Sequence, residues 1–280
     1  NQLMKGFRDT FEGIIMPMTA EENMRRIAVR RSNSTGEDWE TVELPALEKE
    51  FRVLGSYPMF FDSGSSPAIK QLRNKILIAN CGSVNLQIDE IGANLLGQTE
   101  ALNSFLELYD MGRIKDKLIK SNSDNVRSER IDGSTPANML LFGTQSKLFD
   151  GGATEKNFFD FLEMGYARRG IFSVTSRAFT DGEQDIDAII AKMFNADNDT
   201  LMDSVTERIT KLADMSQLHR QIQLPLEALR MLVQYRLYCR KRADSFNNNE
   251  AILRMDMEHR YWKAIKLAGA YAFFDMTAEI

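Results

Sequence analysis

Two adjacent carboxylates, Asp89 and Glu90, directly follow the apolar run Val84–Ile88. If this run is a buried strand, both carboxylates stand at its carboxyl tip, and their side chains diverge because successive residues of a strand alternate in direction. One carboxylate can then hold a nucleotide-bound Mg²⁺, while the other orients and helps deprotonate the water that attacks the γ-phosphate. The pattern indicates a Walker B motif, although a strand that ends in a solvated acidic turn has the same sequence.

A second apolar run, residues 139–143, ends in Thr144 and Gln145. Gln145 suits a sensor of the γ-phosphate, and Thr144 suits a nucleotide contact beside it. The alternative is an amide that caps the following turn. The phosphate loop Gly-x-x-x-x-Gly-Lys-Ser/Thr is absent, since the sequence has no Gly-Lys dipeptide. Two explanations stay open: the loop lies upstream of Asn1 in a longer chain, or the chain does not hydrolyse nucleotide.

Two stretches of basic residues suit phosphate chemistry. Arg168 and Arg169 come just before the apolar run 170–174, where one of the pair can act as an arginine finger and the other as a nucleotide contact. The alternative is a helix end at which cations are favoured by the helix dipole. The second stretch can contact phosphates unless it is only a solvated loop. It comprises Arg113, Lys115, Lys117, Lys120, Arg127 and Arg130.

Alternation of apolar runs with helical patterns indicates a parallel sheet covered on both faces. The predicted strands are 57–61, 84–88, 139–143 and 170–174, and the predicted intervening helices are 66–78, 94–109 and 154–165. Ligands of such sheets bind at the carboxyl ends of the strands, which places Asp62, Asp89, Glu90 and Thr144 at one edge.

Helical patterns dominate the two ends of the chain. Residues 1–31 are predicted to be helical with an interruption at Pro17, and Thr19 is predicted to open a second helix. After residue 180 the predicted helices are 183–194, 198–216, 225–243 and 249–277, with Trp262 on the packed face of the last one. The predicted domains are therefore an N-terminal helical segment (1–50), an α/β core (51–180) and a helical subdomain (181–280).

Composition narrows the class of protein. The chain has 280 residues, 43% of them hydrophobic and 27% charged, with a net charge of −5, which is the balance of a globular protein. No run approaches the length of a membrane span. Two cysteines and two histidines are too few for a disulfide framework or a clustered zinc site. A reducing, cytoplasmic setting is the default expectation.

Several of these motifs, taken in order, resemble the helicase-like ATPase half of phage and plasmid primase-helicase proteins. The resemblance runs from 64–69 through 86–92, 107–110, 140–145, 165–172 and 224–228 to 264–269. It implies a RecA-like core that binds ATP and Mg²⁺, assembles as a ring, expected to be a hexamer, and unwinds DNA, in some cases with a primase. It also implies that the basic stretch 113–130 contacts the backbone of single-stranded DNA.

The resemblance also assigns roles to single residues. It implies Asp89 as the Mg²⁺ ligand, Glu90 as the catalytic carboxylate, Gln145 as the sensor and Arg169 as the finger. Two alternatives remain, namely a catalytically inert module of the same fold that binds DNA or a partner, and another ring ATPase such as a DNA translocase.

Overall fold

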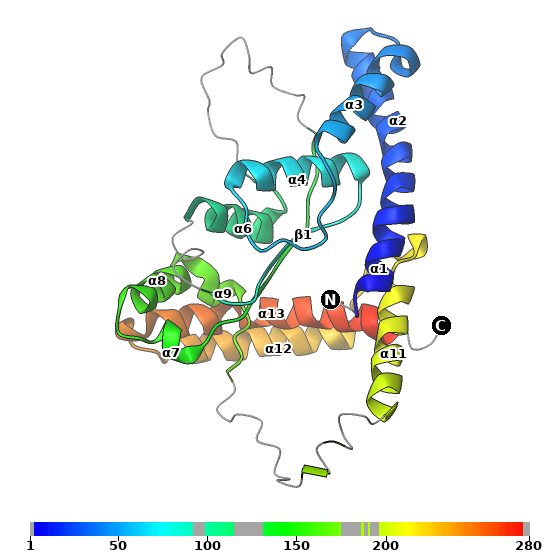
Figure 1. Cartoon of the computed structure of the whole chain (residues 1–280). Coiled ribbons are helices and arrows are strands. Elements are labelled where there is room, and N and C mark those ends of the chain that lie inside the picture. The colour runs from blue at the N-terminus through cyan, green and yellow to red at the C-terminus, as the bar shows by residue number, and fades with distance from the viewer. Residues whose placement is uncertain are drawn as a thin grey trace. The chain divides into compact units, whose positions relative to one another are not determined.

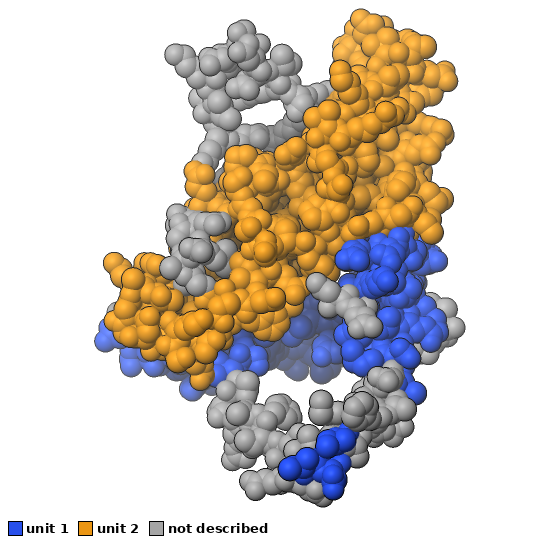
Figure 2. All heavy atoms as spheres, in the orientation of Figure 1, with its two compact units in different colours: residues 1–11, 167–280 blue, residues 12–166 orange. Residues whose placement is uncertain are grey.

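The computed structural model (Figure 1) describes residues 3–91, 99–114, 131–174, 186–187, 190 and 196–276. The chain forms two compact units, which Figure 2 colours separately. One unit comprises residues 12–166, and the other comprises residues 1–11 together with 167–280. The predicted division at residues 50 and 180 stays a prediction.

A small parallel sheet lies in the unit of residues 12–166. Strand β1 (Val84–Ile88) pairs with β2 (Ala137–Leu141) so that Val84 faces Ala137 and Ile88 faces Leu141. On the other edge of β1, Phe61 forms an isolated parallel bridge to Leu86. The predicted strand over 57–61 is thus reduced to one bridge. The described fold is mixed α/β and mostly helical.

A polar side chain inside the sheet ties three segments together. Asn85, on β1, is buried and donates a hydrogen bond of 2.8 Å to the carbonyl of Met59. Its side-chain oxygen accepts from Asn138 of β2 at 2.9 Å. Because a buried amide is unfavourable unless its hydrogen bonds are made, this pairing favours the observed register, which aligns Asn85 with Asn138.

The predicted strand over 170–174 is wrong, since residues 170–174 have no regular secondary structure. Ile171, Phe172 and Val174 are 60%, 52% and 66% exposed. A parallel strand is stabilised by hydrogen bonds to a neighbour and by burial of both faces. This segment has no strand beside it among the described residues, and its apolar side chains are exposed. The apolar run alone could not reveal this.

Two helices of the same unit pack against the strands (Figure 1), but Leu140 of β2 is 52% exposed, so the predicted cover on both faces of the sheet is incomplete. Helix α4 (Ser66–Ala79) begins as predicted, with Ser65 accepting a hydrogen bond from the Ala68 amide and with Pro67 in its first turn. Helix α6 (Thr99–Met111) packs on α4. After β2 come α7 (Gln145–Leu148) and α8 (Ala153–Phe161). Ile69, Ile78, Val84, Leu102 and Leu108 are fully buried or nearly so and form the core.

The N-terminal helices run further than predicted. A π-helical turn (Phe11–Ile15) joins α1 (Lys5–Thr10) to α2 (Met16–Thr35), and a second such turn (Trp39–Glu43) leads into α3 (Leu44–Val53). Pro17 does not end the helix, because the π-helical turn directly before it carries the chain from α1 into α2, with Ile15 itself in helical conformation. Thr19 is likewise no helix start, since it is buried and its hydroxyl bonds to the carbonyl of Ile15.

Replacing Asn23 of α2 by leucine should destabilise the protein. The buried Asn23 amide donates to the carbonyls of Leu77 and Ile78 at 3.1 and 2.9 Å. These carbonyls lie in the last turn of α4, where no intrahelical partner is available. Leaving them buried and unpaired costs about 1–3 kcal/mol in the free energy of unfolding, measured by urea titration. The control Asn80→Gly, at an exposed left-handed position with φ of 58°, should change it by less than about 0.5 kcal/mol. Equal losses in the two variants would contradict this role.

The second unit is helical. It contains α9 (Ala167–Arg169), α11 (Ala196–Lys211), a 3₁₀ turn (Met215–Gln217), α12 (Leu226–Ala243), a 3₁₀ turn (Asn248–Glu250) and α13 (Ala251–Met276). Most of the predicted helix over 183–194 lies outside the described residues. Helices α12 and α13 run side by side as a hairpin (Figure 1). In the part of the chain that the structure describes, every helix is too short or too polar to cross a membrane.

Candidate functional site

The carboxyl ends of β1 and β2 lie against each other. Backbone pairing continues past both strands, with the amide of Phe142 donating to Ile88 at 2.9 Å and the amide of Ile91 donating to Phe142 at 2.7 Å. Asp89 and Glu90 therefore lie directly beside the residues that follow β2. This is the edge at which ligands of parallel sheets bind.

Glu90 contacts two side chains from the β2 end. The Thr144 hydroxyl donates to Glu90 Oε2 at 3.2 Å, and Lys147 Nζ lies 3.6 Å from Glu90 Oε1. The carboxylate is 44% exposed and the lysine 65% exposed, and an exposed ion pair of this kind contributes only about 0.2–1 kcal/mol. Glu90 is thus oriented by its neighbours but remains open to solvent and to a ligand.

Asp89 is the other carboxylate of the pair. Its side chain is exposed and has no hydrogen bond or ion pair to the described residues. Nowhere in the described ranges do three or more His, Cys, Asp or Glu side chains gather as a metal site. A nucleotide-bound Mg²⁺ commonly takes only one or two carboxylates, with phosphates and waters as its other ligands. The open oxygens of Asp89 fit that requirement.

Thr144 and Gln145 are brought to the same edge. Thr144 precedes α7, but its side chain makes no capping bond and binds Glu90 instead. Gln145 is exposed at the first position of α7, and its amide side chain has no hydrogen bond to the described residues. The alternative in which this amide caps the following turn is therefore not observed.

Lys147 is the residue of this edge that the sequence patterns did not single out. It lies on α7, three residues after Thr144, so it comes from the same strand end as the predicted Thr144 and Gln145. Its place just after the strand end was the sequence signal that could have identified Lys147. Its reach to Glu90 depends on where α7 begins, which no motif in the sequence specifies.

The predicted arginines lie in the other compact unit. Arg168 and Arg169 end α9 and are half-buried, whereas Asp89 and Glu90 belong to the unit of residues 12–166. Helix α9 is anchored to α13, because the buried Lys263 ammonium donates to the carbonyl of Ala167 at 2.8 Å and to Asp256 at 2.5 Å. This contact with α13 therefore fixes the position of the segment that carries both arginines.

The predicted DNA-contacting segment is described only at its start. Arg113 is exposed just after α6. The remaining predicted contacts, Lys115, Lys117, Lys120, Arg127 and Arg130, lie outside the described residues.

Comparisons with protein-family models, with curated proteins and with solved structures find no match for this chain. The site and the sequence are therefore the basis of the functional argument. Together they define an acidic, solvent-open edge of a parallel sheet, with two carboxylates from one strand end and a hydroxyl, an amide and an ammonium group from the next.

Proposed function

We propose that this chain is the ATPase core of a ring-forming DNA helicase that hydrolyses ATP between subunits and moves along single-stranded DNA. The observation that carries the proposal is the hydrogen bond of 3.2 Å between Thr144 and Glu90, which joins the predicted catalytic carboxylate to the neighbouring strand end. A RecA-like arrangement requires such a junction, because nucleotide and attacking water meet at this edge.

Each residue of the edge has a role in this proposal. Asp89 would hold Mg²⁺ together with the nucleotide phosphates, and that ion would neutralise charge on them. Glu90 would orient the attacking water and take its proton, with Thr144 fixing the direction of its carboxylate. Gln145 would contact the γ-phosphate. Arg169, with Arg168 beside it, would reach the nucleotide of a neighbouring subunit.

Replacing Thr144 by valine should lower the rate of ATP hydrolysis without abolishing ATP binding. The change removes the hydroxyl that positions Glu90, and a hydrogen bond worth about 1 kcal/mol corresponds to roughly fivefold in kcat. The measurement is steady-state phosphate release, with kcat and KM determined separately. Thr144→Ser keeps the hydroxyl and should restore most of the rate. If the serine and valine variants are equally slow, Thr144 does not act through its hydroxyl.

The second candidate function is an inert module of the same fold, and the absence of a Gly-Lys dipeptide favours it. The two candidates differ in one assay on the full-length natural protein, which is phosphate release from Mg²⁺-ATP with and without single-stranded DNA. The helicase proposal predicts hydrolysis that DNA stimulates. An inert module would bind DNA or a partner without any turnover, and that result would overturn the proposal.

A further inference from the structure

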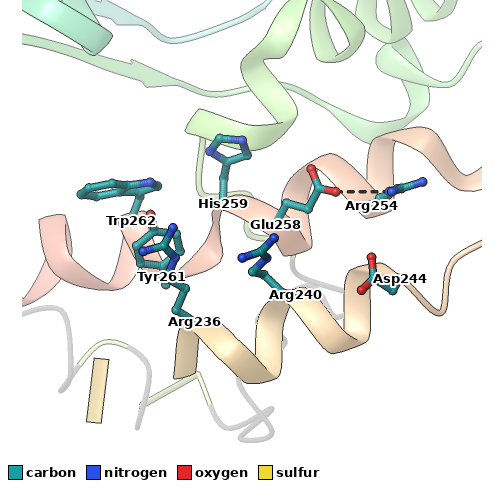
Figure 3. A pocket seen from close by; sticks show the side chains of 8 residues that line it. All are labelled: Arg236, Arg240, Asp244, Arg254, Glu258, His259, Tyr261 and Trp262. Atoms are coloured by element: carbon teal, nitrogen blue, oxygen red, sulfur yellow. Dashed lines mark hydrogen bonds and ion pairs between the residues drawn. The ribbon is translucent and has the colours of Figure 1, made fainter. Parts of the chain in front are cut away.

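A cavity of about 420 Å³ lies between α12 and α13, within the second compact unit (Figure 3). Small-molecule and cofactor pockets commonly measure roughly 300–1,000 Å³, so the cavity can hold a group the size of a nucleotide. Arginines line it from both helices, and Tyr261 and Trp262 line it from α13. None of these residues belongs to the edge that carries Asp89 and Glu90.

Two guanidinium groups face the cavity from α12. Arg236 and Arg240 are exposed, and neither has an ion pair with a carboxylate of the described residues. Arg236 lies over the ring of Tyr261, 5.0 Å from its centroid. Residues four apart on a helix are neighbours, and like charges at this spacing repel. An anion bound between Arg236 and Arg240 would relieve this repulsion.

The acidic residues of the cavity lie toward one end. Glu258 is paired with Arg254 at 3.2 Å, and Asp244 lies at that end of α12, away from Trp262 (Figure 3). The hairpin as a whole (226–276) carries nine Lys and Arg against six Asp and Glu, although the complete chain has a net charge of −5. Positive charge is therefore concentrated on this hairpin. Asp244 lies one turn from Arg240 and offsets part of its charge, whereas no cavity carboxylate lies one turn from Arg236 on α12.

An exposed aromatic surface adjoins the two arginines. Trp262 is 48% exposed, which contradicts its predicted place on the packed face of α13. The centroids of the Tyr261 and Trp262 rings lie 4.7 Å apart, and the guanidinium group of Arg236 lies over the Tyr261 ring. A tryptophan beside unpaired guanidinium groups combines the elements that bind single-stranded nucleic acid, namely a stacking platform for a base and cations for the adjoining phosphates.

We propose that the α12–α13 cavity binds single-stranded nucleic acid, with a phosphate between Arg236 and Arg240 and a base stacked on Trp262. The site is separate from the predicted DNA-contacting segment 113–130 and needs no ATP hydrolysis. Binding is therefore measured without nucleotide, so that failure of this proposal is distinguishable from failure of the ATPase proposal.

The first experiment uses the fluorescence of Trp262. The chain has two tryptophans, Trp39 and Trp262, so Trp39→Phe leaves Trp262 as the reporter. Titration with an oligo(dT) of about 20 nucleotides, longer than a typical single-strand binding site, should quench the emission in a saturable manner. Free dTMP and inorganic phosphate are titrated in parallel. Quenching by dTMP at the same affinity as the oligonucleotide would overturn the single-strand assignment, and the absence of any quenching would overturn the site.

The second experiment removes the two charges. Arg236→Gln with Arg240→Gln should weaken oligo(dT) binding at least about tenfold and reduce the slope of log K against log salt by about 1.4, since each lost phosphate contact on a single strand contributes about 0.7. The matched control, Arg230→Gln with Lys241→Gln, removes the same charge from α12 at exposed positions that do not line the cavity. It should change the slope much less.

The third variant tests stacking. Trp262→Ala should weaken oligo(dT) binding at least about fivefold, whereas Trp262→Phe should recover part of the loss, because base stacking requires an aromatic face. Trp262 is half-exposed in the hairpin, so thermal unfolding of each variant should match that of the natural protein. Equal affinities and salt slopes in the charge variant and its control, with normal binding by Trp262→Ala, would overturn the proposal even if the protein binds DNA elsewhere.

Discussion

Changing Glu90 to glutamine should lower ATP hydrolysis by about a hundredfold or more while ATP binding persists. A general acid or base typically contributes about 10²–10⁴ to the rate, and glutamine keeps the shape of the side chain and its hydrogen bond with Thr144 but cannot accept the water's proton. The measurement is phosphate release at saturating Mg²⁺-ATP, with nucleotide affinity determined separately by equilibrium titration.

Asp89→Asn is the companion variant. Because Asp89 would hold the metal together with the nucleotide, the asparagine variant should lose both hydrolysis and the Mg²⁺ dependence of ATP binding. Asp160→Asn is the matched control, since Asp160 is an exposed carboxylate on α8 and does not follow a strand end. Turnover at the natural rate in Glu90→Gln would remove this edge from consideration as the catalytic site.

Changing Arg169 to alanine should suppress hydrolysis about a thousandfold with little change in nucleotide affinity. An arginine finger stabilises charge that develops only in the transition state, and such residues are worth about 10³–10⁵ in kcat. Arg169→Lys should recover little, because an ammonium lacks the planar, two-pronged donor geometry. Arg168→Ala is the neighbouring control and should weaken nucleotide binding more than it lowers kcat.

Mixing variants tests whether Arg169 acts on a neighbouring subunit. We expect no ATP hydrolysis from rings made only of Glu90→Gln subunits or only of Arg169→Ala subunits. In mixed rings, some interfaces combine an intact Glu90 with an intact Arg169, so partial turnover should return. The dependence of the recovered rate on mixing ratio is the readout. A lack of recovery at every ratio would contradict catalysis between subunits.

Local signals predicted helices better than they predicted strands. The predicted helix start at Ser66, with Pro67 in the first turn, is confirmed for α4, because proline preferences act within one turn. The apolar run 170–174 has the composition of a strand, but a strand also needs a partner, and partners are set by the packing of distant segments. Pro17 was misread for a related reason, since no local signal predicted the π-helical turn that directly precedes it and carries the helix past the proline.

The candidate site was partly predictable. The approach of Thr144 to Glu90 follows from the rule that parallel strands end at the same edge of a sheet. The contact of Lys147 with Glu90 and the exposure of Trp262 were not predictable, because both depend on side-chain packing. A tryptophan in a helical pattern has the same spacing whether its face is packed or open to solvent.

Strand separation of a forked DNA substrate tests the central claim most directly. The full-length natural protein is incubated with the fork, Mg²⁺ and ATP, and the released single strand is quantified over time, with Glu90→Gln as the paired sample. We expect release by the natural protein, none by Glu90→Gln, and none when ATP is replaced by an analogue that cannot be hydrolysed. Strand release that is equal in both proteins, or no release together with no ATP hydrolysis, would contradict it.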